Sequence, residues 1–456
     1  MVTRTFEPRS LAIDPLSVVR GEWRASGSKS IAQRAIVIAA LSSGTTRLVG
    51  LPRGDDVAAA RRLLAAVGVE HHAPTPASLS IVGRPPAWRG GWRPASVEAG
   101  ESGTLARLCI ASLALCSQPG ESVEVRASGS LAARSSRALI EALERGGVEV
   151  LSRTWPIRLR AIGPPSTLVL ERPESSQEAS ALAIALAAYP DENELRIEGE
   201  LPSRPYFELT RAVLAQFGAR VELVKDERSD DERNDERETW RVRGPLRAPL
   251  DPLAIEPDAS LAAVALAAAC LSGGELTALG LQSSSAQGDV RIVEHLRAFG
   301  CFARASKQGL RASGFPQRGA ELDLRGEPDL APVLAMVAAG AALVAPSGST
   351  RSVLRGLETL NRKESRRLDV LSAGLRAAGW RAEARDGALW LDAPPARLER
   401  TPLELHSSGD HRMAFAFALL GLLRAGVVVH DANCVAKSWP SFWRDMGELG
   451  LRSSPA

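Results

Sequence analysis

The chain has 456 residues, more than one ordinary domain holds, so two or three domains are expected. Hydrophobic residues make up 45% and charged residues 24%, which is the composition of a folded globular protein and excludes a disordered or fibrous chain. The 56 basic and 53 acidic residues leave a net charge of +3, which argues against nucleic acid as a partner.

No segment of the sequence predicts export or a membrane span. The N-terminus lacks the apolar stretch of a signal peptide, and the longest weakly polar run, residues 331–346, is short and interrupted by Pro332 and Gly340. The five cysteines form no C-x-x-C pair and lie mostly in apolar runs, as reduced core thiols do. We therefore expect a cytoplasmic protein without a membrane partner.

One short pattern recurs six times along the chain: a helix end with Leu or Met, three further residues, a glycine and an apolar residue. The six glycines are Gly68, Gly147, Gly218, Gly300, Gly379 and Gly450. Their intervals are 79, 71, 82, 79 and 71 residues, so the first two spacings recur as the last two. Each glycine is predicted to end a helix in the left-handed conformation, and the chain to consist of two halves with three similar units each.

Each unit also contains a segment that is apolar on all sides of a predicted helix. In chain order these segments are residues 31–44, 105–120, 178–189, 260–274, 330–343 and 413–423. A helix of this kind must be surrounded by protein, so three buried helices covered by sheets are expected in each half. The prediction is an α/β fold of two lobes with internal threefold pseudo-symmetry. Residues 28–255 would form one lobe, and residues 1–27 with 256–456 the other.

A charged run, residues 225–238, contains eight acidic and four basic residues. Such a run is typical of a solvated loop, and we predict a hairpin tip in the third unit.

Polar segments precede most of the buried helices. In chain order they read GSKSIAQRA (27–35), AGESGTLAR (99–107), PESSQEAS (173–180), EPDLAPV (327–333) and SSGDHRMAF (407–415). The first places Lys29 and Arg34 with Ser28 and Ser30 at a helix start, where free backbone amides attract anions. Two more such segments are RKESRR (362–367) and CVAKSWPSF (434–442).

Cations are concentrated in these segments. The chain has only five lysines against 51 arginines, and three of the five, Lys29, Lys363 and Lys437, lie there. The full set of convergent cations is Lys29, Arg34, Arg134, Lys363, Arg367, Arg412 and Lys437. Since unpaired buried cations are costly, this set predicts a small substrate with several negative charges.

Three residues of these segments also have ordinary structural explanations. His411 can be a packed core histidine, Asp329 a helix cap, and Glu364 an ion-pair partner of Arg367. His71 and His72 form an isolated pair, and no metal-binding, Walker, dinucleotide or nucleophile motif occurs. No metal or cofactor is therefore expected.

Eight motifs in their order resemble the EPSP synthase (3-phosphoshikimate 1-carboxyvinyltransferase) family of enolpyruvyltransferases. They are GSKSIAQRA, GESGTLAR, SSQEASALA, SRPYFELT, QGD, RKESRRL, GDHRMAFA and AKSWPSF, and the likeness extends from about Ala25 to Gly450. The resemblance implies an inside-out α/β barrel of βαβαββ units in each lobe. It also implies a monomer that moves the enolpyruvyl group of phosphoenolpyruvate to the 5-hydroxyl of shikimate 3-phosphate, on the route to chorismate and aromatic amino acids.

The resemblance also implies roles for individual residues. Those on shikimate 3-phosphate would be Lys29, Ser30, Arg34, Ser175, Ser176, Gln177, Ser203, Tyr206, Asp329, Thr359 and Lys363. Those on phosphoenolpyruvate would be Lys29, Gly103, Arg134, Gln177, Arg367, Arg412 and Lys437. The catalytic residues would be Asp329 as base, Glu364 as proton donor aided by Lys29 or Lys437, and His411. Which group moves each proton stays open.

The sequence departs from the family pattern at six positions: Glu101, Ser130, Ser135, Thr359, Arg366 and Gly409. Two alternatives therefore stay open. One is the sister enzyme that acts on UDP-N-acetylglucosamine, although its usual loop cysteine is missing from residues 127–137. The other is a catalytically silent homologue that binds anions.

Overall fold

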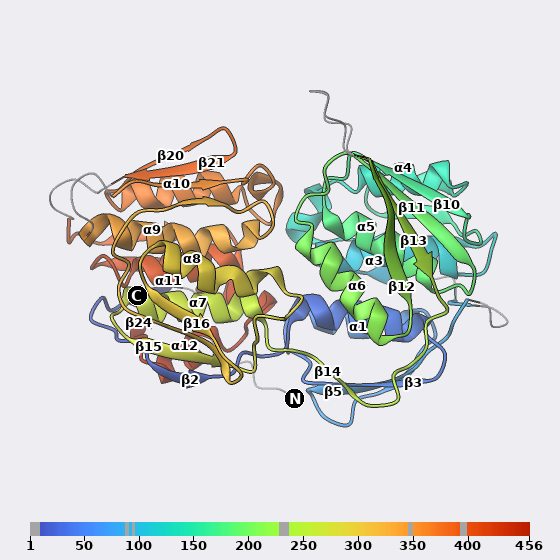
Figure 1. Ribbon diagram of the computed structural model, residues 1–456, viewed down its shortest axis with the longest axis horizontal. Helices are drawn as coiled ribbons and strands as arrows, with labels where there is room; N and C mark the ends of the chain where they lie inside the picture. The colour runs from blue at the N-terminus through green and yellow to red at the C-terminus, as the bar shows by residue number, and fades with distance from the viewer. Residues whose placement is uncertain (1–9, 87–90, 94–95, 228–236, 345–349, 393–398) are drawn as a thin grey trace. The chain divides into compact units, whose positions relative to one another are not determined.

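The computed structural model describes residues 10–86, 91–93, 96–227, 237–344, 350–392 and 399–456, with the backbone alone at 225–227. The chain divides into two compact units (Figure 1). The N-terminal lobe is Gly27–Glu256, and the C-terminal lobe combines Met1–Ser26 with Pro257–Ala456.

The six sheets described in the two lobes have four strands each and share one topology. The first strand pairs parallel with the second, and the third pairs antiparallel with both the second and the fourth. In the N-terminal lobe the orders are β14-β3-β5-β4 (Leu253–Ala254, Thr45–Val49, Ser78–Val82, Glu70–His72), β6-β7-β9-β8 (Ser96–Glu98, Ser122–Arg126, Ile157–Arg160, Glu149–Ser152) and β10-β11-β13-β12 (Thr167–Glu171, Glu192–Glu198, Arg237–Arg243, Arg220–Glu227).

The C-terminal lobe repeats this arrangement. Its orders are β2-β15-β17-β16 (Gly21–Trp23, Glu275–Leu279, Gly309–Ser313, Phe302–Ala305), β18-β19-β21-β20 (Glu321–Asp323, Ser352–Arg355, Ala388–Asp392, Arg381–Arg385) and β22-β23-β1-β24 (Leu403–His406, Val427–His430, Ser10–Ile13, Ser453–Pro455). In the last sheet the N-terminal strand β1 takes the third position, between two strands from the end of the chain. The predicted α/β fold of two lobes with three similar units each is confirmed.

The apolar segments form the buried helices that their composition predicts. They are α1 (Lys29–Leu41), α3 (Gly103–Cys116), α5 (Ser176–Ala187), α7 (Ala259–Leu271), α9 (Ala331–Val344) and α11 (His411–Leu420). In the C-terminal lobe α7, α9 and α11 contact one another, with β20 and β21 on one side and β2 and β15 on the other (Figure 1). None of the helices in the described part of the chain has the length and hydrophobicity that crossing a bilayer requires.

A second, amphipathic helix follows in each unit. These helices are α2 (Asp55–Ala66), α4 (Arg137–Arg145), α6 (Pro205–Gln216), α8 (Ile292–Ala298), α10 (Arg367–Ala377) and α12 (Phe442–Glu448). Short 3-10 turns complete the set: η1 (Gly129–Ala133), η2 (Gly288–Arg291), η3 (Pro328–Leu330), η4 (Leu360–Arg362) and η5 (Ala432–Lys437). The six repeated glycines each lie two residues beyond an amphipathic helix and have φ angles from 73° to 111°, as predicted.

The charged run lies where a hairpin was predicted. Strands β12 and β13 pair antiparallel on either side of it. Its tip, residues 228–236, is outside the described residues.

Gly450 provides a test of the helix-ending glycines. Its φ is 111°, and a Cβ there would collide with the carbonyl oxygen of Val18, so Gly450→Ala should lower stability by at least about 2 kcal/mol. Gly447, inside α12, has open space around its Cα, so Gly447→Ala should raise stability by up to about 1 kcal/mol. Thermal unfolding of the two variants measures both effects, and equal melting temperatures would contradict this account.

Candidate active site

Arg367, the first residue of α10, is the centre of a charged cluster in the C-terminal lobe. Its side chain is 1% exposed, and its Nε lies 2.7 Å from Oδ2 of Asp410. Its Nη1 lies 2.9 Å from Oδ1 of Asp329, and its Nη2 contacts Glu364. Burial lowers the pKa of Arg367, but the three carboxylates raise it by more, so the net direction is upward. The guanidinium therefore stays charged although it is buried.

Asp329 lies in the turn η3, directly before the buried helix α9. Three cations surround its carboxylate: Arg367, Arg412 at 3.1 Å and Lys363 at 3.5 Å. Burial raises the pKa of Asp329, but Arg412, Lys363 and Arg367 together hold it well below its usual range. Asp329 is thus an ionised carboxylate shared by several cations, which goes beyond the role of a helix cap.

Glu364 and Lys437 extend this cluster. The Nζ of Lys437, at the end of η5, lies 3.3 Å from Oε1 of Glu364. Arg412, near the start of α11, donates from Nη1 to the carbonyl oxygen of Asp329 at 3.1 Å. The structure therefore brings together six residues predicted for the site: Asp329, Lys363, Glu364, Arg367, Arg412 and Lys437.

Two further residues were predicted for the site, His411 and Thr359. His411 is buried, with Nδ1 4.0 Å from Oδ1 of Asp410 and its ring edge-on to Phe415. These contacts are those of a packed core histidine, and a catalytic role for His411 stays a prediction. Thr359 precedes η4, and its buried hydroxyl has no hydrogen-bond partner within the described residues.

Asp410 was not chosen from the sequence, although it belongs to the SSGDHRMAF segment. It caps α11 by accepting a hydrogen bond from the backbone N–H of Arg412 at 3.0 Å. It also accepts one from the hydroxyl of Ser365 at 3.0 Å. Asp410 therefore ties the start of α11 to the segment that carries Arg367.

Hydrogen bonds also link Arg412, through Ser260, to Asp289 of the QGD motif. Arg412 Nη2 donates to the hydroxyl of Ser260 at 3.2 Å, and that hydroxyl contacts the carboxylate of Asp289. Burial raises the pKa of Asp289 to about 7, although the charge of Arg412 opposes the shift. The sequence singled out QGD as a motif but gave no role to Asp289 or Ser260.

The buried carboxylate of Glu327, two residues before Asp329, pairs with two basic side chains. Glu327 is fully buried, with Oε1 2.7 Å from Nε2 of His295 and 2.9 Å from Nη1 of Arg291. Its carbonyl oxygen accepts the N–H of Leu330 at 3.0 Å and so closes the turn that holds Asp329. The sequence carried no signal for this cluster, because Glu327 is more than 30 residues from both His295 and Arg291.

Removing Glu327 should be costly. Glu327→Ala leaves His295 and Arg291 without their buried partner, so we expect a loss of about 3–5 kcal/mol in unfolding free energy. Glu294→Ala removes the exposed partner of the same Arg291, 3.3 Å away, and should cost less than about 1 kcal/mol. Thermal and urea unfolding compare the two variants. A loss of unfolding free energy for Glu327→Ala as small as that for Glu294→Ala would contradict this description of the cluster.

The N-terminal lobe contains a second cationic cluster, around Gly103 at the start of α3. Arg107 donates from Nη1 to the carbonyl oxygen of Gly103 at 3.0 Å and to Oε1 of Gln177 at 3.2 Å. A Cβ on Gly103 would lie 3.0 Å from Nη1 of both Arg107 and Arg134. Burial, and next the charge of Arg134, lower the pKa of Arg107 to about 10. The structure thus places Gly103, Arg134 and Gln177 together, with Arg107 as a member that the sequence list missed.

Lys29, Ser30 and Arg34 all lie on α1. The Nζ of Lys29 is 3.0 Å from Asp56. Arg34 donates from Nη1 to the carbonyl oxygen of Ser30 at 2.9 Å, and from Nη2 to that of Tyr206 at 3.3 Å. Burial lowers the pKa of Arg34 to about 10. Arg34 therefore joins α1 to α6 and brings Ser30 and Tyr206 together.

Ser203 and Ser175 shape the starts of two helices. Ser203 has a φ of 54°, and its carbonyl oxygen accepts the N–H of Tyr206 at 3.0 Å, just before α6. Ser175 caps α5 in a capping box with Glu178, which fixes the start of the helix that carries Ser176 and Gln177.

Two of the departures from the family pattern contact each other. The hydroxyl of Ser130 donates to Oε2 of Glu101 at 3.2 Å. Arg366, a third departure, pairs with Asp369 at 2.7 Å on the exposed side of α10. Gly409 has a φ of 70°, a conformation that glycine adopts without strain. Within the described residues no group of three or more His, Cys, Asp or Glu side chains could hold a metal ion.

Glu178 provides a pH-dependent test. Burial raises its pKa to about 7, although Arg107 and two backbone N–H groups oppose the shift. A raised pKa makes the folded carboxyl neutral while the unfolded one ionises, so stability is lost as pH rises from about 4.5 to about 7. Glu178→Gln keeps an acceptor for the capping box and removes this loss.

The free energy of unfolding of Glu178→Gln should therefore rise relative to that of the parent protein between pH 4.5 and 7, by up to about 3 kcal/mol, and the difference should level off above pH 7. Urea unfolding at several pH values measures this difference. Glu171→Gln, at an exposed position on β10, controls for the loss of a charge alone. A difference that does not change with pH would contradict the burial effect.

Comparison with known proteins identifies the family. The family model described as EPSP synthase (3-phosphoshikimate 1-carboxyvinyltransferase) matches residues 13–446. The chain is 31% identical over 448 residues to the 3-phosphoshikimate 1-carboxyvinyltransferase of Pectobacterium carotovorum subsp. carotovorum (strain PC1), with 96% of this chain and 98% of the relative covered. It is 29% identical over 456 residues to the protein of the same name from Mannheimia haemolytica, with 97% and 99% covered.

Solved structures show the same fold. EPSP synthase from Acinetobacter baumannii aligns with a TM-score of 0.73 at 20% identity, and 98% of this chain and 99% of that chain are covered. The enolpyruvyl transferase NikO from Streptomyces tendae aligns with a TM-score of 0.72 at 18% identity, with the same coverage. The two-lobe fold is therefore that of the enolpyruvyltransferases. The chain belongs to the EPSP synthase (3-phosphoshikimate 1-carboxyvinyltransferase) family, and the UDP-N-acetylglucosamine alternative is not favoured.

Proposed function

We propose that this chain transfers the enolpyruvyl group of phosphoenolpyruvate to the 5-hydroxyl of shikimate 3-phosphate and releases phosphate. The observation that carries the proposal is the cluster in which ionised Asp329 shares Arg367, Arg412 and Lys363 while Glu364 pairs with Lys437. The reaction needs a base, an acid and cations for anionic groups, and this cluster supplies all three types.

Asp329 is proposed as the base for the 5-hydroxyl. With three cations around it, its pKa is well below its usual range, so its free carboxylate is ionised but only weakly basic. Anionic groups of the bound substrates would draw positive charge away from Asp329 and raise its pKa. The base would thus gain strength when the substrates are present.

Glu364 is proposed as the acid, with Lys437 or Lys29 assisting. It would protonate the methylene carbon of phosphoenolpyruvate while the 5-hydroxyl oxygen, losing its proton to Asp329, bonds to the neighbouring carbon. The tetrahedral intermediate then gives up a methyl proton, restores the double bond and expels phosphate. Arg367, Arg412 and Lys437 would hold the phosphate and carboxylate throughout.

The N-terminal lobe would hold the remaining parts of both substrates. Gly103, Arg134 and Gln177 are assigned to phosphoenolpyruvate, since two guanidinium groups lie beside Gly103 there. The residues assigned to shikimate 3-phosphate are Lys29, Ser30, Arg34, Ser175, Ser176, Gln177, Ser203 and Tyr206, with Asp329, Thr359 and Lys363 from the other lobe. Action as a monomer in the cytoplasm is part of the proposal and rests on the family resemblance alone.

The first experiment mixes purified protein with phosphoenolpyruvate and either shikimate 3-phosphate or UDP-N-acetylglucosamine. Phosphate release with the shikimate acceptor alone, and a product heavier by one enolpyruvyl group, is the expected result. Release with the nucleotide sugar alone would overturn the proposal. If no phosphate is released with either acceptor while phosphoenolpyruvate still binds, the protein is the catalytically silent homologue.

Asp329→Asn tests the base. The change keeps the shape of the side chain but removes its basic oxygen, so kcat should fall by about 10²–10⁴-fold. Because Arg367, Arg412 and Lys363 also lose a shared carboxylate, the melting temperature should fall as well, and kcat is compared at a temperature where the variant is folded. Asp323→Asn breaks an exposed pair with Arg325 in the same lobe, and its kcat should stay within about twofold of the parent value. Near-normal turnover of Asp329→Asn would remove Asp329 from the role of base.

A further inference from the structure

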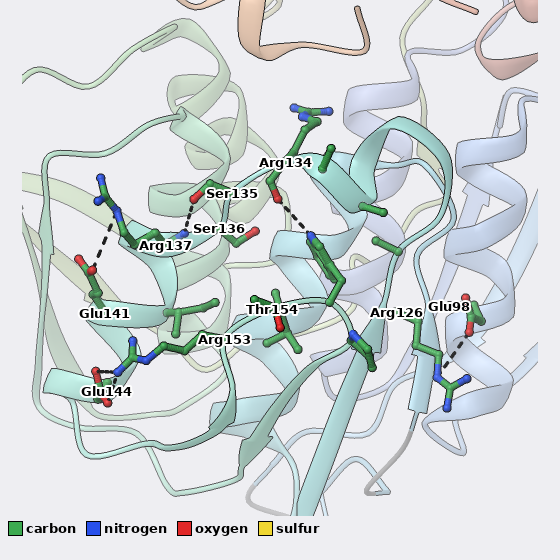
Figure 2. A pocket seen from close by; sticks show the side chains of 17 residues that line it. Glu98, Arg126, Arg134, Ser135, Ser136, Arg137, Glu141, Glu144, Arg153 and Thr154 are labelled. Atoms are coloured by element: carbon green, nitrogen blue, oxygen red, sulfur yellow. Dashed lines mark hydrogen bonds and ion pairs between the residues drawn. The ribbon is translucent and has the colours of Figure 1, made fainter.

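A cavity of about 1140 Å³ lies in the N-terminal lobe behind Arg134 (Figure 2). Ile140 of α4 and residues 155–157 form its apolar lining, together with Ala132 and Ala133 of η1, and Arg134 lies at its edge. The arginines at its rim are already paired with glutamates, as Arg153 is with Glu144 and Arg126 with Glu98. Its charge therefore favours no particular ligand, but its position bears on Arg134.

Trp155 connects this cavity to Arg134. The indole Nε1–H donates to the carbonyl oxygen of Arg134 at 3.1 Å. Figure 2 shows the guanidinium of Arg134 turned away from the cavity. On that other side, its Nη1 lies 3.0 Å from where a Cβ of Gly103 would be. The backbone of Arg134 thus faces Trp155 while its charge faces Gly103.

The side chain of Arg134 has little else to fix it. No carboxylate pairs with it in the described parts of the chain, and its buried Nε has no hydrogen-bond partner there. Its backbone is held by its own N–H bond to the carbonyl oxygen of Leu131 at 2.9 Å. Next to it, the carbonyl oxygen of Ser135 accepts a bond from Arg107 at 2.6 Å. Because a cavity lies behind it, close packing does not hold this peptide in place, so its hydrogen bonds do.

We propose that Trp155 is a positioning residue for Arg134. Its indole N–H holds the Arg134 peptide against the lobe, and this directs the guanidinium to Gly103. Without that bond the segment can relax into the cavity, and the guanidinium moves away from the anion it serves. The inference rests on the proposed function, which places Arg134 on phosphoenolpyruvate.

Trp155→Phe tests this inference, because it keeps an aromatic ring and removes the N–H. The KM for phosphoenolpyruvate should rise about three- to tenfold, the range expected for one neutral hydrogen bond, while kcat and the KM for shikimate 3-phosphate stay within about twofold. Thr154→Val is the matched control, since Thr154 lines the same cavity and Trp155 keeps its bond. Equal changes in both KM values or in kcat would overturn the proposal.

A double-mutant cycle shows whether Trp155 acts through Arg134. Arg134→Ala should weaken the binding of phosphoenolpyruvate more than Trp155→Phe does. Adding Trp155→Phe to Arg134→Ala should not weaken this binding further. Full additivity of the two effects would overturn the positioning role. Calorimetric titration with phosphoenolpyruvate gives the same comparison without turnover, so it tests Trp155 even if the parent protein proves silent and the proposed function fails.

Discussion

The buried guanidinium of Arg367 is the constraint on which the C-terminal lobe's site depends. A charge that is 1% exposed is tolerated only with well-placed partners, and three carboxylates from three segments supply them. Asp329 comes from the turn before α9, Glu364 from the segment before α10, and Asp410 from the cap of α11. One cation therefore fixes the starts of these segments relative to one another.

The two cationic clusters differ in how their charge is balanced. In the C-terminal lobe the cations come with Asp329, Glu364 and Asp410, so much of the charge is compensated within the protein. In the N-terminal lobe Arg107 bonds to neutral carbonyl groups, and the guanidinium of Arg134 lies beside it. Two neighbouring cations without a carboxylate bound to them favour an incoming anion strongly. The first cluster suits proton transfer, and the second suits capture of an anion.

The fold was largely predictable, because each unit repeats its own signals. The helix-ending glycines and the all-apolar segments gave the six units, since both patterns act over a few residues. Contacts between distant residues were not predictable in this way. Nothing local shows that Glu327 pairs with His295, that Trp155 bonds the backbone of Arg134, or that Arg34 turns toward α6. The sequence thus located the cations and one near partner, Glu364 beside Arg367, but not the distant partners that hold them.

The position of β1 between β23 and β24 affects the order in which the chain can fold during synthesis. The N-terminal lobe is one continuous segment, so it can fold while the rest is still on the ribosome. Residues 10–13 have no such freedom, because their partner strands are the last described strands in the chain. These residues stay without their partner strands until about four hundred further residues have been synthesised, and only then can the sheet that contains β1 form. The last sheet of that lobe therefore cannot form before β23 and β24 have been synthesised, so a chain that stops before Val427 leaves β1 without both of its partner strands.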